Sequence, residues 1–205
     1  MTKKILFTVA VVALLSGITV LAINQVRDQP SQLSQPTEHP LYKYREWGEI
    51  DAQSQPYAPR VEGNVITIPS QRIDAIEETA RLFEIPYSRE DAVDSIARRE
   101  TLYLTALREG YTVSDEEIDE FVQLQIDMSS KASNLDIFNE YLIGYGMSLE
   151  EYWRDQRDKL TKDLLASRYL DDHLPPSSGQ EDAARDSMKQ KLEADARKAF
   201  EIVIE

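Results

Sequence analysis

The sequence predicts a mainly α-helical domain preceded by a transmembrane helix. Three observations predict it: an uncharged apolar run at 5–23, a series of amphipathic segments with helix-start signals, and two β-prone segments, 64–68 and 200–205, at the ends of the helical region. We expect those two segments to pair as a small two-stranded sheet. In chain order, the expected parts are a cytoplasmic n-region at 1–4, a signal anchor at 5–23, a Pro- and Gln-rich linker at 24–63 and a helical domain at 64–205.

The N-terminal apolar run is long enough to cross a membrane. At a rise of about 1.5 Å per residue it spans about 28 Å, close to the roughly 30 Å of a bilayer's hydrocarbon core. Lys3 and Lys4 precede it and should stay in the cytoplasm, which places the bulk of the chain outside. Two interpretations remain open: a retained anchor, and a cleaved signal peptide with Val20 and Ala22 at the small-residue positions before the cut. The length of the run favours the anchor.

Explicit start signals open the predicted helices. In a capping box, a Ser side chain accepts a hydrogen bond from the backbone N–H three residues on, and the acid there reaches back to the N–H of the Ser. Three pairs have this spacing: Ser88 with Asp91, Ser114 with Glu117, and Ser148 with Glu151. We expect helices that begin near residues 70, 88, 114, 135, 148 and 181. The helix from residue 148 should run unbroken until Pro175 stops it.

Composition excludes several kinds of site. The net charge of −14 disfavours binding to nucleic acid and to anionic lipid headgroups, so we expect no nucleic-acid partner. The chain has no Cys, which excludes disulfides, thiol nucleophiles and zinc–thiolate sites. His39 and His173 lie far apart in the sequence, and the seven Gly are scattered singly. We therefore expect no metal, no cofactor and no catalytic residue.

The expected linker is interrupted by aromatic residues. Prolines are frequent over 24–63, which favours an extended tether between the membrane and the domain. Tyr42, Tyr44 and Trp47 break this pattern. They could pack against the domain or form a short recognition patch, and packing is the commoner explanation.

Three sequence segments within 88–174 carry a family resemblance. They read AVDSIARRE at 92–100, EGYTVSDEEID at 109–119 and YGMSLEEY at 145–152. With these segments, the region resembles the N-terminal helical domain of SurA/PrsA-type extracytoplasmic chaperones. The run VEGNVIT at 61–67 is similar to the entry strand of that family. The resemblance covers about half of the chain and consists of helix signals rather than chemical motifs.

The resemblance implies a membrane-tethered module that holds unfolded or nascent exported polypeptides outside the cytoplasm. The membrane contact would be the run that begins with Ile5 and ends with Ile23. In this family a parvulin-type prolyl isomerase domain commonly follows the helical region. The stretch after Leu170 is too short for such a domain, so we expect no isomerase activity. The segment 181–205 would then complete the helical domain directly.

Candidate peptide contacts are apolar residues of the predicted helices, since aromatic rings and flexible Met side chains adapt to varied partners. The candidates are Phe121, Met128, Phe138, Tyr141, Met147 and Trp153. For each of them an ordinary place in the core is the competing interpretation. Two other functions stay open: a specific adaptor within an envelope complex, and, less favoured, a prolyl isomerase.

Overall fold

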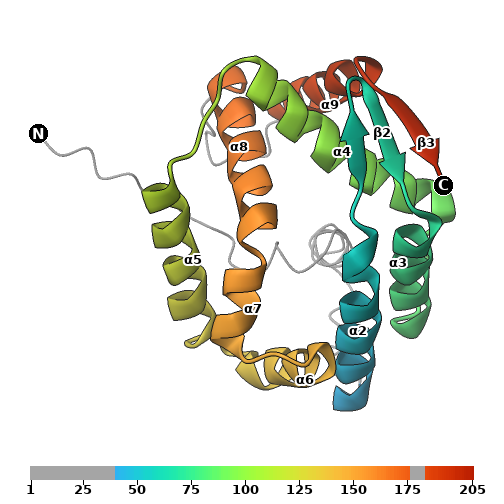
Figure 1. The fold of residues 1–205 in the computed structure, drawn as a ribbon, viewed down its shortest axis with the longest axis vertical. Helices are drawn as coiled ribbons and strands as arrows, with labels where there is room; N and C mark the ends of the chain where they lie inside the picture. Colours follow the sequence, from blue (N-terminus) through green and yellow to red (C-terminus); the bar gives the residue numbers. More distant parts are fainter. Residues whose placement is uncertain (1–39, 176–182) are drawn as a thin grey trace, which may run out of the picture. The chain divides into compact units, whose positions relative to one another are not determined.

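The computed structural model describes residues 40–175 and 183–205, so the expected anchor at 5–23 lies outside the described residues. The described part is mainly helical with a small three-stranded sheet (Figure 1). No helix within these two stretches combines the length and the apolar character needed to cross a membrane.

The elements follow one another with short connections. In chain order they are α2 (Leu41–Ser54), the 3-10 helix η1 (Gln55–Tyr57), β1 (Arg60–Glu62), β2 (Val65–Ile68), α3 (Ser70–Leu82), α4 (Arg89–Arg108), α5 (Asp115–Ser129), α6 (Leu135–Tyr145), α7 (Leu149–Asp155), α8 (Arg157–His173), α9 (Ala183–Lys198) and β3 (Glu201–Ile204). Helix α2 packs on α3 and α6, while α4 packs on α3, α8 and α9 (Figure 1). Helix α5 lies against α7 and α8.

The capping boxes predicted from the sequence are all present. Ser114 receives a hydrogen bond of 3.2 Å from the backbone N–H of Glu117 and returns its own N–H to the Glu117 carboxylate at 2.9 Å. Ser88 and Ser148 open α4 and α7 in the same way. Gly146 ends α6 in the left-handed region, with φ of 81°. These local signals explain why the helix starts were predictable.

The first expected boundary needs correction, because residues 41–62 of the segment assigned to the linker already belong to the folded part. Helix α2, η1 and β1 all lie within the expected linker at 24–63. Trp47 is buried on α2, with its ring 5.7 Å from that of Phe83 and 4.9 Å from that of Tyr141. The prediction that the aromatic segment packs on the domain is confirmed.

The predicted long helix from residue 148 is also corrected, since it is two helices, α7 and α8. They meet at Gln156, which has φ −75° and ψ 5° and is buried. Its side-chain amide donates to the Tyr145 hydroxyl at 3.3 Å and to the Asp155 carboxylate at 3.1 Å. No Pro or Gly marks the position, so nothing in the local sequence predicted the break.

The predicted pairing of the two ends of the helical region is confirmed. Strand β2 pairs with β3 in parallel, with Val65 opposite Glu201 and Ile68 opposite Ile204. The N–H of Ser70, the first residue of α3, donates to the Glu205 carbonyl at 2.7 Å, and Pro69 precedes the helix. The sheet has a third strand that was not expected: β1 joins β2 antiparallel.

The sheet contributes to a core of buried aliphatic residues. Ile66 and Ile68 of β2 and Ile73 of α3 have no exposed surface, and they pack with Phe200, which precedes β3. The Arg108 guanidinium of α4 lies 4.1 Å from the centre of the Phe200 ring. The end of the helical region is thereby held against its beginning.

Helices α2 and α6 approach each other backbone to backbone. A Cβ at Gly48 would lie 2.7 Å from the Tyr145 backbone nitrogen and would collide with the Tyr141 carbonyl oxygen. A Cβ at Gly144 would lie 2.7 Å from the Arg45 carbonyl carbon. Both obstacles are backbone atoms, which a rotamer change cannot move aside. The crossing therefore requires glycine on both helices.

We expect Gly48→Ala to lower the free energy of unfolding by about 2 kcal/mol or more, because the two backbones must separate to admit the methyl group. Urea unfolding followed by circular dichroism measures this. The matched control is Glu49→Ala, an exposed position in the same helix, which should change stability by less than about 0.5 kcal/mol. Equal stability of the two variants would contradict the close approach.

The hydrogen bonds of Glu117 predict that the free energy of unfolding depends on pH. Hydrogen bonds from the Ser114 backbone and from the Arg168 guanidinium, 2.8 Å away, lower the pKa of Glu117 to about 2. Folding therefore favours the ionised carboxylate, and its contribution is full above its ordinary pKa of 4.5 and is lost as the pH falls toward 2. We expect Glu117→Gln to melt below the wild type at neutral pH, and this difference to shrink across that window. Glu116→Gln, in the same exposed turn, is the control.

Candidate functional site

Aromatic residues of α2, α6 and α7 form one buried cluster. We call it the aromatic cluster; its members are Trp47, Phe138, Tyr141, Tyr145, Tyr152 and Trp153. Tyr141 and Tyr152 meet edge to face, with ring centres 5.7 Å apart at 90°. The Trp153 indole N–H donates to the Ser129 hydroxyl of α5 at 3.0 Å. Edge-to-face contacts and satisfied polar tips are typical of a specific core.

The structure separates the six predicted peptide contacts into two groups. Phe138, Tyr141 and Trp153 come together in the aromatic cluster, and each is less than a tenth exposed. A ring buried in this way offers a peptide no surface in this conformation. Phe121 of α5, Met128 of α5 and Met147 before α7 are half-buried. For these three, contact with a peptide stays a prediction.

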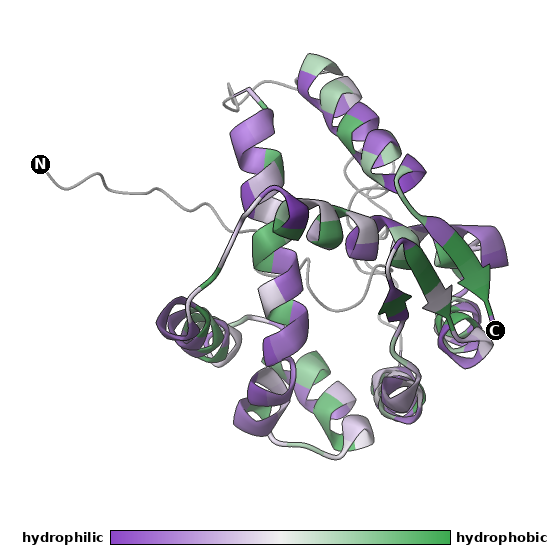
Figure 2. Cartoon of the chain, turned by 45° about the horizontal axis from the view of Figure 1, so that its top comes forward, coloured by the Kyte–Doolittle hydropathy of each residue, from purple (hydrophilic) through white to green (hydrophobic). Residues whose placement is uncertain are grey.

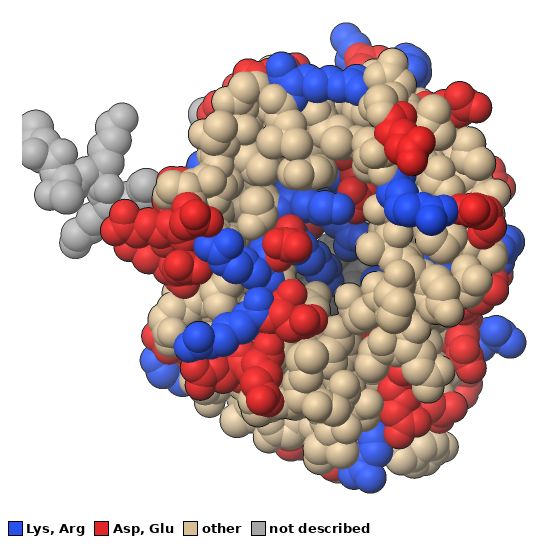
Figure 3. Space-filling view, viewed as in Figure 1, with Lys and Arg blue, Asp and Glu red and all other residues tan. Residues whose placement is uncertain are grey.

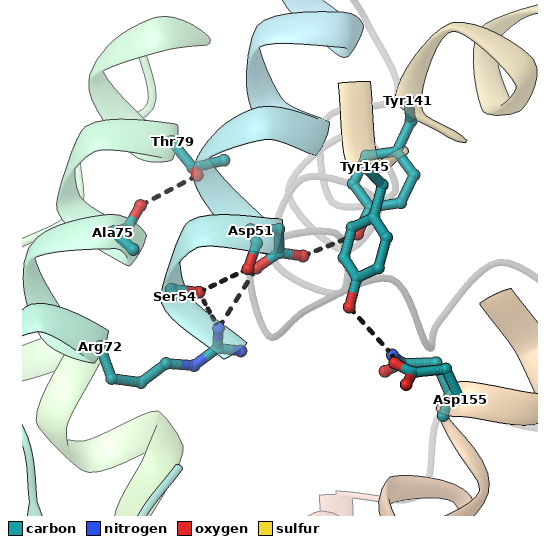
Figure 4. A network of polar contacts seen from close by, with 9 residues as sticks. Asp51, Ser54, Arg72, Ala75, Thr79, Tyr141, Tyr145 and Asp155 are labelled. Carbon is teal, nitrogen blue, oxygen red and sulfur yellow. Dashed lines mark hydrogen bonds and ion pairs between the residues drawn. The ribbon is translucent and has the colours of Figure 1, made fainter. Parts of the chain in front are cut away.

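A polar network lies beside the aromatic cluster and joins three helices (Figure 4). The Tyr141 hydroxyl of α6 donates to the Asp51 carboxylate of α2 at 2.8 Å. Arg72 of α3 pairs with the same carboxylate at 3.3 Å and also donates to the Ser54 hydroxyl. Ser54 is buried and donates to the Asp51 carbonyl at 2.8 Å. Because its polar groups have partners, the network stabilises one arrangement of α2, α3 and α6.

The buried tyrosines serve this network as hydrogen-bond donors and acceptors. Burial, followed by the charge of Asp51, raises the pKa of Tyr141 well above its ordinary value. Burial likewise raises the pKa of Tyr145 and of Tyr152. All three phenols are therefore protonated at neutral pH. A protonated phenol is neither a general base nor an activated nucleophile, so the geometry here is that of a structural network.

An ion pair joins α4 to α8. Figure 3 shows Lys and Arg side chains around a hollow near the middle of one face of the molecule. The Glu100 carboxylate is almost fully buried and receives a hydrogen bond of 2.8 Å from Lys162 of α8. The Arg99 guanidinium lies 3.7 Å from the same carboxylate. Burial raises the pKa of Asp163, which directly follows Lys162 in α8. Lys162 therefore links α8 to α4, whereas Arg99 and Glu100 are neighbours within α4.

A pocket of about 220 Å³ opens between α2 and α3. Its lining residues are Ile50, Gln53, Ser54, Tyr57, Gln71, Asp74, Ala75 and Glu78. Asp74 already accepts a hydrogen bond of 2.5 Å from Arg89. None of the eight lining residues is a His, Cys or Lys, and the Ser54 hydroxyl donates to the Asp51 carbonyl at 2.8 Å.

Several exposed apolar residues lie outside the six predicted peptide contacts. Leu41 and Tyr42 at the start of α2 are 47% and 61% exposed, and Ile143 of α6 is 57% exposed. Val203 and Ile204 of β3 are 38% and 49% exposed. For Ile143, the sequence signal is its position outside the periodic apolar stripe of its helix.

In the stretches that the structure describes, no group of three or more His, Cys, Asp or Glu side chains is placed to hold a metal ion. Comparisons of the chain with protein-family models, with curated proteins and with solved structures found no match.

We expect Tyr141→Phe to lower the free energy of unfolding by about 1.5–3 kcal/mol, because it removes a hydrogen bond to a charged acceptor in a half-buried network. Urea unfolding measures the change. Tyr42→Phe removes the same hydroxyl from an exposed ring and should leave the unfolding midpoint unchanged. A similar midpoint for both variants would show that the network contributes nothing to stability.

Proposed function

We propose that this chain is a membrane-tethered, extracytoplasmic module that binds unfolded or nascent exported polypeptides without catalysing a reaction. The apolar run at 5–23 would be the tether, and the helical unit would be similar in build to the N-terminal domain of SurA/PrsA-type chaperones. The fold supports this through the pairing of β2 with β3. That pairing completes a helical unit without room for an isomerase domain between its elements.

One observation carries the proposal: the unit packs its aromatic residues inside but leaves aliphatic and Tyr side chains of several elements exposed. They lie on α2, α6, α5 and β3. A binder of many unfolded chains needs apolar contacts at several places, each weak, rather than one deep pocket. The net charge of −14 keeps such a surface soluble and attracts basic client segments.

A second candidate is an adaptor that binds one folded protein of an envelope complex. The observation that favours it is the burial of Phe138, Tyr141 and Trp153, since an open aromatic cradle would leave such rings accessible. An adaptor binds a single partner tightly through one compact patch. A chaperone binds many unfolded chains weakly, and this difference decides the experiment.

We expect the full chain, reconstituted in lipid nanodiscs, to suppress the aggregation of a chemically unfolded protein at near-stoichiometric ratios. Light scattering follows the aggregation, with empty nanodiscs and a folded protein as controls. No suppression by a chain whose circular dichroism is that of the folded state would reject the chaperone proposal and favour the adaptor. In a parallel assay, the chain should not accelerate cis–trans isomerisation of a proline peptide.

A further inference from the structure

Strand β3 is an edge of the three-stranded sheet, and the hydrogen-bonding pattern shows which of its backbone groups are not bonded to β2. The sheet order is β1, β2, β3. The N–H of Glu201 donates to the Asn64 carbonyl at 2.8 Å, and the N–H of Glu205 donates to the Ile68 carbonyl at 3.1 Å. In a parallel ladder, alternate residues bond to one neighbour. The N–H and C=O groups of Ile202 and Ile204 therefore point away from β2.

No strand of the described residues lies on that outer side of β3. After Glu201 the strand is hydrophobic (Figure 2), and Val203 and Ile204 are well exposed. An edge with apolar side chains and free backbone groups accepts an additional strand from another chain. The position thus has the main-chain chemistry needed to bind an extended peptide.

The side chains of β3 select the charge of the added strand. Successive side chains of a strand point to opposite faces, so Glu201, Val203 and Glu205 share one face. Glu201 is exposed, and Glu205 is exposed beside its partner Arg60. A strand that places Lys or Arg opposite these acids gains from cross-strand charge pairs, while one that places acids there is repelled.

We propose that the outer edge of β3 binds an extended segment of an unfolded polypeptide in which two basic residues flank an apolar centre, in the pattern Lys-x-Val-x-Lys. This rests on the proposed function and names the class of client segment. A second copy of β3 is a poorer occupant, because antiparallel pairing would bring Glu201 of one copy opposite Glu205 of the other.

The test uses fluorescein-labelled peptides and the full chain in nanodiscs, with binding followed by fluorescence anisotropy. Lys-Ile-Val-Ile-Lys, flanked by Gly and Ser, should bind about tenfold more tightly than Glu-Ile-Val-Ile-Glu in the same flanks. One further peptide is N-methylated at its two Ile residues, and another is N-methylated at its Lys and Val residues. The two sets of methyl groups block opposite hydrogen-bonding edges of the peptide. We expect one of these methylated peptides to lose binding and the other to retain it. Equal binding by all the peptides would overturn the proposal.

Protein variants test the same edge from the other side. Ile204→Pro removes an N–H that β2 does not use, and an edge strand tolerates Pro in that orientation. We expect it to weaken binding of the basic peptide about tenfold, whereas Ile204→Ala, which keeps the N–H, weakens it less than about threefold. Glu201→Lys should remove most of the preference between the two peptides, because one Lys and one Glu then face the added strand. Circular dichroism and thermal melting confirm that each variant is folded.

The outcomes separate this inference from the function on which it rests. If Ile204→Pro still binds the basic peptide as the wild type does, the edge is not the site. Undiminished suppression of aggregation by that variant would leave the chaperone proposal standing with another binding surface. If the peptide results hold but the wild type suppresses no aggregation, β3 binds strands and the chaperone proposal fails.

Discussion

The contact between α2 and α6 is the constraint on which the described unit depends. Gly48 and Gly144 let the two backbones meet without intervening side chains. That approach brings Trp47 onto Tyr141 and places Asp51 within hydrogen-bonding distance of the Tyr141 hydroxyl. The aromatic cluster and the polar network are thus two consequences of one close crossing. Because α2 also packs on α3, the crossing connects α6 and α7 to the part of the unit that carries the sheet.

Several polar groups inside the unit pair across its helices. The phenols of the aromatic cluster are held protonated, and the Glu100 carboxylate is matched by Lys162. Buried polar groups of this kind stabilise a particular arrangement when each has a partner. The surface is different, since it carries a large excess of acid and scattered apolar side chains.

How much was predictable follows from how local each signal is. The capping boxes at Ser88, Ser114 and Ser148 need only four residues each, and the helices begin where they predict. The pairing of β2 with β3 followed from there being two β-prone segments with no other partners. Helix α2 was missed because prolines precede and follow it in the sequence, as in a linker, and its stability comes from tertiary contacts. The burial of Phe138 and Trp153 could not be predicted from the sequence either, because periodicity shows that a helix face is apolar but not which element covers it.

The positions of β2 and β3 in the chain also set the order in which the two strands emerge during synthesis. Residues 65–68 emerge early, and their partner at 201–204 follows only after all the intervening helices. A contact that spans such a distance is slow to form, since the chain must first lose the entropy of closing a very long loop. Until then Ile66 and Ile68 have no strand beside them on that side. A nascent chain of this protein would itself present an open strand edge, the same feature that it is proposed to recognise in others.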